Sequence, residues 1–435
     1  MLLAAALVAS TVLAGCAPPG LAANPRFATD SGAGPQGQPA ATPEAGGPPP
    51  IATPKNKLPW HDCTSRVFGD AGVPAAPGVQ LDCASYDADV DPGGGSALVS
   101  IGVVRARSVQ TPADAGPVVF TTGWDLPSSL QLPVWLSRAG ADVLRDHPIV
   151  AVDRRGTGMS SAVDCRDRFQ RQEMWDQAQF EPGDDPVANL GAVAMNATTD
   201  CTDIISPGES AYDNTHAATD IERLRSIWDV PALALIGVGN GAQIALTYTG
   251  SHPDKVVRLV LDSPISLGVA AEAAAEQRVK GQQATLDAFA AQCLAVNCAL
   301  GDDPKGAVDA LLAAARSGHG PGGASIASVA HAIITALGYR TGDRVSSTTD
   351  LANALAAARS GDNNLLTNLI NRAEATQGSD GRFINSCADA LERPTPDRVR
   401  ELVVAWSKLY PQFGAVGALD MMKCLSWPSS SAPEP

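Results

Sequence analysis

The chain has 435 residues, of which 45% are hydrophobic and 18% charged, and its formal net charge is -15 at pH 7. This length can bury a large core and suits one large domain with an insertion. We expect no nucleic-acid partner, because phosphate binding needs clustered Lys and Arg that the sequence does not show. The acidity is instead typical of a soluble surface.

The N-terminus predicts an exported lipoprotein. Met1 to Ala14 form an apolar run too short to span a bilayer, and residues 13–16 read Leu-Ala-Gly-Cys. This pattern resembles bacterial lipoprotein signals, which implies a signal peptide at 1–15, a lipidated Cys16, and anchoring in the cell envelope with the membrane as partner. No Lys or Arg precedes Arg26, which would place the true translation start upstream. The alternative is a buried apolar helix with a chance Cys.

Eight cysteines remain once Cys16 is set aside, an even number in a chain that we expect to be exported. Disulfides are therefore expected, although eight cysteines allow about 105 connectivities. No His shares a tight ligand spacing with a Cys pair, so we expect no metal and no cofactor. Neighbours in the sequence suggest pairing Cys63 with Cys83, Cys165 with Cys201, Cys293 with Cys298, and Cys387 with Cys424.

Residues 16–57 are rich in Pro and Gly and predict a tether between the lipid and a folded body that begins near Leu58. Short, continuously apolar runs then predict parallel strands covered on both faces. Helices with one apolar face lie at 220–228 and 242–252. This alternation predicts a doubly wound, mostly parallel α/β sheet over 58–266. The expected strands are 97–104, 117–120, 148–153, 232–236 and 256–262.

From residue 267 to 428 the sequence consists of Ala-rich segments whose apolar residues recur with the period of a helix, and it contains no convincing strand. Residues 429–435 form a polar tail. This predicts a helical insertion that caps a cleft, with a plain structural subdomain as the alternative. The clearest helices are expected at 272–292, 305–316, 351–359, 363–375 and 396–406.

The turn at 237–241, Gly-Val-Gly-Asn-Gly, joins the strand that ends at Ile236 to the helix that begins at Ala242. Strand, Gly-rich turn and helix together are the context of a nucleophile elbow. Glycine suits such a turn because a strained backbone and a close helix crossing leave little room for Cβ. Turns of this kind also cradle phosphates, so the pattern alone is a moderate signal.

Residues 149–161 sharpen the interpretation, because they resemble the Asp-x-Arg-Gly-x-Gly-x-Ser turn of proline-iminopeptidase and tripeptidyl-aminopeptidase-like α/β-hydrolases. The similarity continues through 218–225, the elbow and 252–262. The helical insertion is similar only in its placement and in the Cys-x-x-Trp-Pro run at 424–428. The resemblance implies an α/β-hydrolase-like sheet with a helical cap and serine exopeptidase chemistry.

The chain departs from that family at its chemistry. The family has Ser at the third elbow position, activated by His and Asp, and backbone N-H groups that meet the oxyanion. Here that position is Gly239, and the amide of Asn240 is not a nucleophile. Residues 121–127 replace the family's oxyanion loop; the N-H groups of Gly123 and Trp124, with Asn240, are the remaining candidates. Trp124 could instead fill the cleft, and a simple turn is the alternative.

The family's Asp and His follow two further strands, which we expect to be absent here, leaving the strand at 256–262 as an unpaired edge. The other histidines are expected to be surface or cap residues: His216, His252, His319 and His331. Three functions remain open, in this order: a non-catalytic protein that binds a peptide or lipid, an active aminopeptidase or esterase, and a structural envelope lipoprotein. An active enzyme would need an unrecognised nucleophile such as Ser160, Ser161 or Ser263.

Overall fold

The computed structural model describes residues 49–91, 97–137, 141–179, 183–338 and 344–428. The predicted signal peptide, Cys16 and most of the predicted tether lie outside these residues. Within them, no helix is both long enough and apolar enough to cross a membrane.

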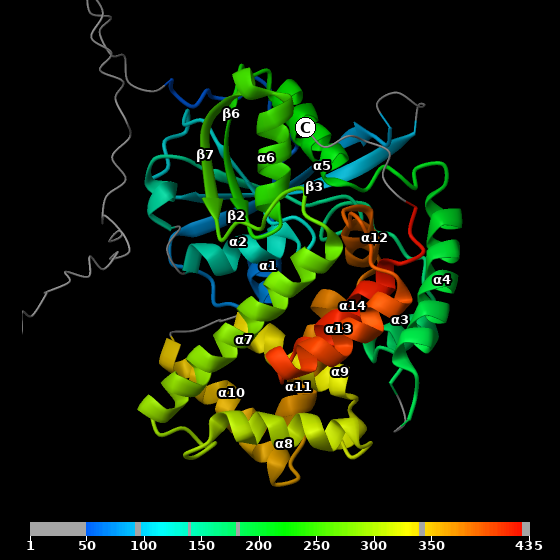
Figure 1. Ribbon diagram of the computed structural model, residues 1–435. Helices are drawn as coiled ribbons and strands as arrows, with labels where there is room; N and C mark the ends of the chain where they lie inside the picture. The colour runs from blue at the N-terminus through cyan, green and yellow to red at the C-terminus, as the bar shows by residue number, and fades with distance from the viewer. Residues whose placement is uncertain (1–48, 92–96, 138–140, 180–182, 339–343, 429–435) are drawn as a thin grey trace, which may run out of the picture. The chain divides into compact units, whose positions relative to one another are not determined.

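A seven-stranded sheet forms the core, in the order β1-β2-β3-β5-β4-β6-β7 (Figure 1). Strands β5, β4, β6 and β7 are parallel, whereas β1, β2, β3 and β5 pair antiparallel. The predicted α/β class with a doubly wound, mostly parallel sheet is confirmed. The strands are β1 (His61–Asp62), β2 (Val79–Asp89), β3 (Leu98–Ser108), β4 (Val118–Thr121), β5 (Ile149–Val152), β6 (Leu233–Val238) and β7 (Val256–Asp262).

Two details of the strand prediction were wrong. The run at 97–104 is part of β3, which is antiparallel to both neighbours rather than parallel. Strand β2 was not predicted, because its residues alternate between buried and exposed positions in place of a continuous apolar run. Strand β7 pairs only with β6 among the described residues, as expected for an edge, and its Val260 is 51% exposed.

Helices cover both faces of the sheet. On one face α5 (Asn214–Trp228) and α6 (Gly241–Ser251) pack through Ile221, Leu224 and Tyr248. On the other face α1 (Thr64–Ala71) and α2 (Ser128–Trp135) pack through Phe68 and Leu132. The doubly wound arrangement follows, because apolar strands need cover on both sides.

The remaining helices form the cap (Figure 1), whose hydrophobic core is separate from the two cores that flank the sheet. Four of the five predicted segments lie within a helix, and the segment 363–375 begins one residue before its helix. The cap helices at 168–175, 186–205, 326–338, 380–388 and 414–420 were not predicted. Helices α3 (Arg168–Trp175) and α4 (Pro186–Ile205), which precede the predicted insertion, contribute to the same core through Met174 and Leu190. The other cap helices are α7 (Ala271–Ala295), α8 (Pro304–Arg316), α9 (Ile326–Gly338), α10 (Arg344–Arg359), α11 (Asn364–Gln377), α12 (Asp380–Ala388), α13 (Pro396–Leu409) and α14 (Gly414–Asp420).

All four predicted disulfides are present: Cys63 with Cys83, Cys165 with Cys201, Cys293 with Cys298, and Cys387 with Cys424.

The last residues assigned to the tether lie against the folded body. The backbone N-H of Lys55 donates to the carbonyl of Trp228 at 2.9 Å, and Ile51 and Ala52 pack against the two sheet cores. Ordered contacts therefore begin several residues before Leu58.

Candidate functional site

The elbow is a tight junction between β6 and α6. A Cβ at Gly237 would lie 2.7 Å from the Cα of Ala242, and a Cβ at Gly241 would lie 2.0 Å from the carbonyl oxygen of Thr121. Such distances leave no room for a side chain, so both glycines are needed for the helix to cross the strand. Gly239 between them has φ +57°, in the left-handed region.

Position 239 offers no nucleophile and faces a carboxylate. A Cβ built on Gly239 would lie 3.2 Å from Oδ2 of Asp125, the only heavy atom of the described residues within 4 Å once the chain neighbours are left aside. The N-H of Gly239 donates to the carbonyl of Asp262 at 3.0 Å. A serine here would therefore meet a carboxylate and no imidazole.

The three oxyanion-hole candidates come together at this junction. Gly123 has φ +70°, and a Cβ there would lie 2.8 Å from the backbone carbon of Asn240, so the loop after β4 packs directly on the elbow. The side chains of Asn240 and Trp124 are 2% and 7% exposed, and Nδ2 and Nε1 respectively are buried without a hydrogen-bond partner. Their role in meeting an oxyanion stays a prediction.

A cavity of about 1370 Å³, its open mouth included, lies above the elbow. Asn240 and Gln243 form its floor, and the cap contributes residues from α7, α9, α12 and α14. Trp124 is part of the wall, so it does not fill the space. Trp175, Phe383 and Met174 add an apolar surface. The arrangement is that of a ligand pocket with a few polar groups in an apolar wall.

The Asp-x-Arg-Gly-x-Gly-x-Ser loop after β5 is built of buried polar groups, most of which are hydrogen-bonded. The carboxylate of Asp153 accepts from the N-H of Ser129 at 2.8 Å and of Met159 at 2.7 Å. Burial raises the pKa of Asp153 to about 6, although these hydrogen bonds act to lower it. Arg155 forms a doubly hydrogen-bonded ion pair with Asp220, with both bonds at 2.8 Å. These residues fix the loop and do not line the cavity.

Helix α12 is fastened to the same loop. Arg154 donates to both carboxylate oxygens of Asp389, at 2.6 and 3.0 Å. The side-chain amide of Asn385 donates to the carbonyl of Arg155 at 2.8 Å. A Cβ at Gly381 would lie 1.8 Å from the carbonyl oxygen of the loop's Gly156, so the helix touches the loop backbone. These contacts with the loop after β5 therefore determine where α12 lies in the wall of the cavity.

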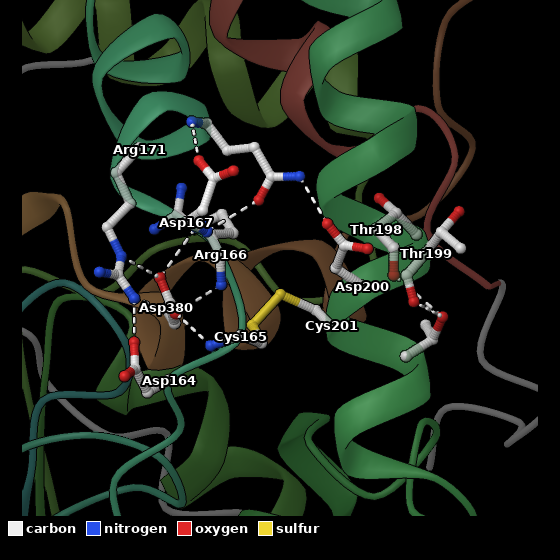
Figure 2. The surroundings of a disulfide bond; sticks show 12 residues. Asp164, Cys165, Arg166, Asp167, Arg171, Thr198, Thr199, Asp200, Cys201 and Asp380 are labelled. Atoms are coloured by element: carbon white, nitrogen blue, oxygen red, sulfur yellow. Dashed lines mark hydrogen bonds and ion pairs between the residues drawn. A yellow bond between two sulfur atoms is a disulfide. The ribbon is translucent and has the colours of Figure 1, made fainter.

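A buried ion-pair network holds the other end of α12, beside the Cys165–Cys201 disulfide (Figure 2). Asp380 accepts from Nε of Arg166 at 2.9 Å, from Arg171 at 2.9 and 3.1 Å, and from the N-H of Cys165 at 2.6 Å. Burial acts to raise the pKa of Asp380, but these donors outweigh it and lower the pKa to about 2. The network places Arg382, one half-turn later, at the cavity.

One expectation about histidines was wrong. His331 on α9 is 4% exposed and lines the cavity, with Nε2 3.6 Å from Oδ2 of Asp420 and its ring 4.6 Å from that of Trp175. Burial lowers its pKa, although Asp420 opposes this. An Ala-rich helix in the sequence gave no sign that it faces a cavity.

The other histidines have structural or surface positions. Nδ1 of His216 lies 2.7 Å from Asp213, the residue that caps α5. His252 ends α6 and stacks on Tyr248 at 5.0 Å, and His319 is exposed.

The three alternative serines also lie outside the cavity lining. Ser160 Oγ donates to the carbonyl of Asp153 and accepts from the N-H of Gly102, both at 2.9 Å. Ser161 Oγ accepts from the N-H of Ser100 at 3.1 Å. Ser263 donates to Asp262 at 3.0 Å. None of these contacts supplies an imidazole base.

Within the described residues, no group of three or more His, Cys, Asp or Glu is placed to hold a metal ion.

One comparison with known proteins agrees with the α/β fold. A family model described as alpha/beta hydrolase fold matches residues 118–305. The serine protease Hip1 of Mycobacterium tuberculosis and that of Mycobacterium bovis are each 24% identical to this chain over 164 residues, which is 37% of this chain and 32% of theirs. The chain thus spans about a third of the length of these curated relatives.

Solved structures give weak global similarity. A hydrolase from Pseudomonas aeruginosa is 14% identical, with 46% of this chain and 52% of that chain covered and a TM-score of 0.26. A haloalkane dehalogenase variant from Agrobacterium tumefaciens is 15% identical, with 48% and 50% covered and a TM-score of 0.25.

Proposed function

We propose that this chain, whose core has the alpha/beta hydrolase fold, is an exported, lipid-anchored protein that binds a ligand above its elbow and does not hydrolyse it. The observation that carries the proposal is the elbow itself, where Gly239 stands in place of a nucleophile. A Cβ built on Gly239 would lie 3.2 Å from Oδ2 of Asp125. We also propose descent from proline-iminopeptidase and tripeptidyl-aminopeptidase-like enzymes, supported by the loop at 153–160 and by the helical cap.

Both halves of acyl-transfer chemistry are compromised at this site. A covalent intermediate requires a nucleophilic side chain, which Gly239 does not have. The oxyanion of the tetrahedral intermediate requires donors, whereas Asp125 brings negative charge to the same corner. Loss of the nucleophile alone lowers the rate of a serine hydrolase by about 10⁶-fold.

Binding is supported over a purely structural role by the state of the cavity. A spacer would gain stability from filling the space above the elbow with side chains, because empty volume costs packing energy. Here a cavity stays open between the elbow and the cap, with aromatic walls and polar groups at several points. Such a cavity suits a peptide-like or lipid-like ligand.

Hydrolysis assays test the proposal directly. Purified protein is incubated with p-nitrophenyl esters and with fluorogenic amino-terminal peptide amides, and the rates are compared with those of Gly239→Ala. We expect equal rates near the buffer background. Because φ at this position strains an L residue, the thermal melt of the variant must first show that it is folded. Turnover well above that of Gly239→Ala, or labelling by a fluorophosphonate probe, would establish an active hydrolase instead.

The lipid anchor is tested separately. Expression of the full chain in a bacterium fed an alkyne fatty acid should label the protein and place it in the membrane fraction. Cys16→Ala should abolish both results, whereas Cys16→Ala protein that is still labelled would contradict lipidation at this position.

A further inference from the structure

The cavity wall carries an unusual set of unsatisfied donors. Nε1 of Trp124, Nε1 of Trp175 and Nδ2 of Asn240 are all buried without a hydrogen-bond partner among the described residues, and each of these side chains is at least nine-tenths buried. Nε of Arg382 and Nε of Arg393 are unpartnered as well. Buried donors without partners cost stability, so their concentration in one cavity indicates that a ligand supplies acceptors.

Among the described residues, the unpartnered buried side-chain atoms of the cavity lining are nitrogens and not oxygens. The buried side-chain oxygens without partners, such as those of Gln131, Gln283 and Asn363, all belong to residues outside the cavity lining. One further orphan atom of the lining is Nδ1 of His331. In the tautomer that carries its proton on Nε2, which lies 3.6 Å from Oδ2 of Asp420, this atom can accept one hydrogen bond from a ligand.

The cavity is also positively charged in a chain of net charge -15. Two carboxylates, Asp389 and Asp420, belong to the lining, and each has a cationic partner, Arg154 and Lys423 respectively. The cations of the lining outnumber them and are Arg166, Arg171, Arg278, Arg382, Arg393 and Lys423.

Three of these cations lack a carboxylate partner. No carboxylate of the described residues lies within 4.0 Å of Arg278, Arg382 or Arg393. Arg278 and Arg382 instead place their guanidinium groups 5.0 and 5.2 Å from the ring centre of Trp124. Burial lowers the pKa of Arg382, and Asp125 opposes this only at longer range.

We infer that the cavity binds an organic acid, in which a carboxylate is received by Arg382 and Arg278 beside Trp124 and an apolar body lies along the aromatic and aliphatic wall. Arg is suited to this because its planar fork donates two parallel hydrogen bonds to a carboxylate. The apolar body would contact Trp175, Phe383 and the segment at 265–269. This inference rests on the proposed function, since the acid is a ligand and not a product.

The same head group occurs in fatty acids and at the C-terminus of peptides, so the test uses both. Isothermal titration calorimetry on the purified protein compares dodecanoate with dodecanamide, and N-acetyl-phenylalanine with N-acetyl-phenylalaninamide. Each acid should bind at least about tenfold more tightly than its amide, because a charge-assisted hydrogen bond contributes more than a neutral one. If the natural ligand is a fatty acid, dodecanoate should bind more tightly than N-acetyl-phenylalanine; if it is a peptide C-terminus, the order should be reversed.

Variants locate the head group. Arg382→Gln should weaken acid binding about tenfold and leave amide binding unchanged, and Arg278→Gln, at the exposed mouth, should act in the same direction. Arg382→Lys should restore part of the affinity. Arg316→Gln, an exposed arginine at the end of α8, is the matched control and should have no effect. Thermal melts confirm that each variant is folded.

The outcomes separate this inference from the proposed function. Amides that bind as tightly as the acids, or acid binding that Arg382→Gln and Arg278→Gln leave unchanged, would overturn the inference while a non-hydrolytic binding role stands. Tight acid binding by a protein that also turns over esters would overturn the proposed function while the carboxylate site stands. Binding of neither acid would refute the inference.

Discussion

Removing the charge of Asp380 should destabilise the cap. This side chain is 3% exposed and accepts hydrogen bonds from Arg166, Arg171 and the backbone of Cys165. Asp380→Asn keeps the shape but directs an amide N-H₂ toward these donors. Arg166, itself 6% exposed, would then be a buried cation without a carboxylate.

Two estimates give the magnitude. Breaking a buried ion pair by removing one partner costs about 3–5 kcal/mol. The pKa of Asp380, lowered from 3.8 to about 2, corresponds to about 2.5 kcal/mol at about 1.36 kcal/mol per pKa unit. We therefore expect a loss of about 2–4 kcal/mol at neutral pH. Because the folded-state pKa is depressed, this stabilisation is present above about pH 4 and is lost as the pH falls toward 2.

Urea unfolding followed by tryptophan fluorescence measures this loss at pH 7 and again at pH 3. The difference in the free energy of unfolding between wild type and Asp380→Asn should be smaller at pH 3. Asp287→Asn is the control, because Asp287 is 52% exposed and its pair with Lys305 should contribute less than about 1 kcal/mol. A loss no larger than that of the control, or a difference that does not shrink at pH 3, would refute the reasoning.

Three further predictions follow from the packing. Gly239→Ser should leave ester and peptide hydrolysis at the wild-type background, because the nearest side-chain atom is the carboxylate of Asp125; measurable turnover in the same reporter assay would contradict this. Gly381→Ala should cost about 1–3 kcal/mol in urea unfolding by overpacking, whereas Gly281→Ala, with open space around its Cβ position on α7, should be neutral or stabilising by up to about 1 kcal/mol. Equal effects of these two would count against the packing argument. Reduction of the four disulfides should lower the thermal midpoint, since the two longest loops, with sequence separations of 36 and 37 residues, should each contribute about 3–4 kcal/mol; an unchanged midpoint would contradict it.

The sequence was informative where local pattern determines structure. Strands β4, β5 and β6 are continuous apolar runs because both faces of the sheet are covered, and these runs predicted them closely. The disulfide pairs followed from short separations along a chain that we expect to be exported. Strand β2 was missed because alternation with many polar residues does not separate a strand from a loop at that length.

The cavity wall could not be predicted, because contacts between distant segments place it. Helix α12 carries Gly, Asn and Ser within nine residues and has little helical signal of its own. Its position depends on Asp380 pairing with Arg166 and on Asp389 pairing with Arg154, at separations of 214 and 235 residues. The donors that would receive a carboxylate meet only after these pairs have formed.

The elbow separates what the fold requires from what catalysis requires. Gly237 and Gly241 are demanded by backbone atoms within 2.7 and 2.0 Å of their Cβ positions, and any chain with this strand-to-helix crossing needs them. Gly239 is different, since among the described residues only a side-chain oxygen of Asp125, at 3.2 Å, limits the space there. A residue with a side chain in this left-handed conformation would cost about 1–2 kcal/mol, which glycine avoids. Once chemistry no longer needs a nucleophile at position 239, backbone strain therefore favours glycine there, and the turn keeps its shape without the reaction.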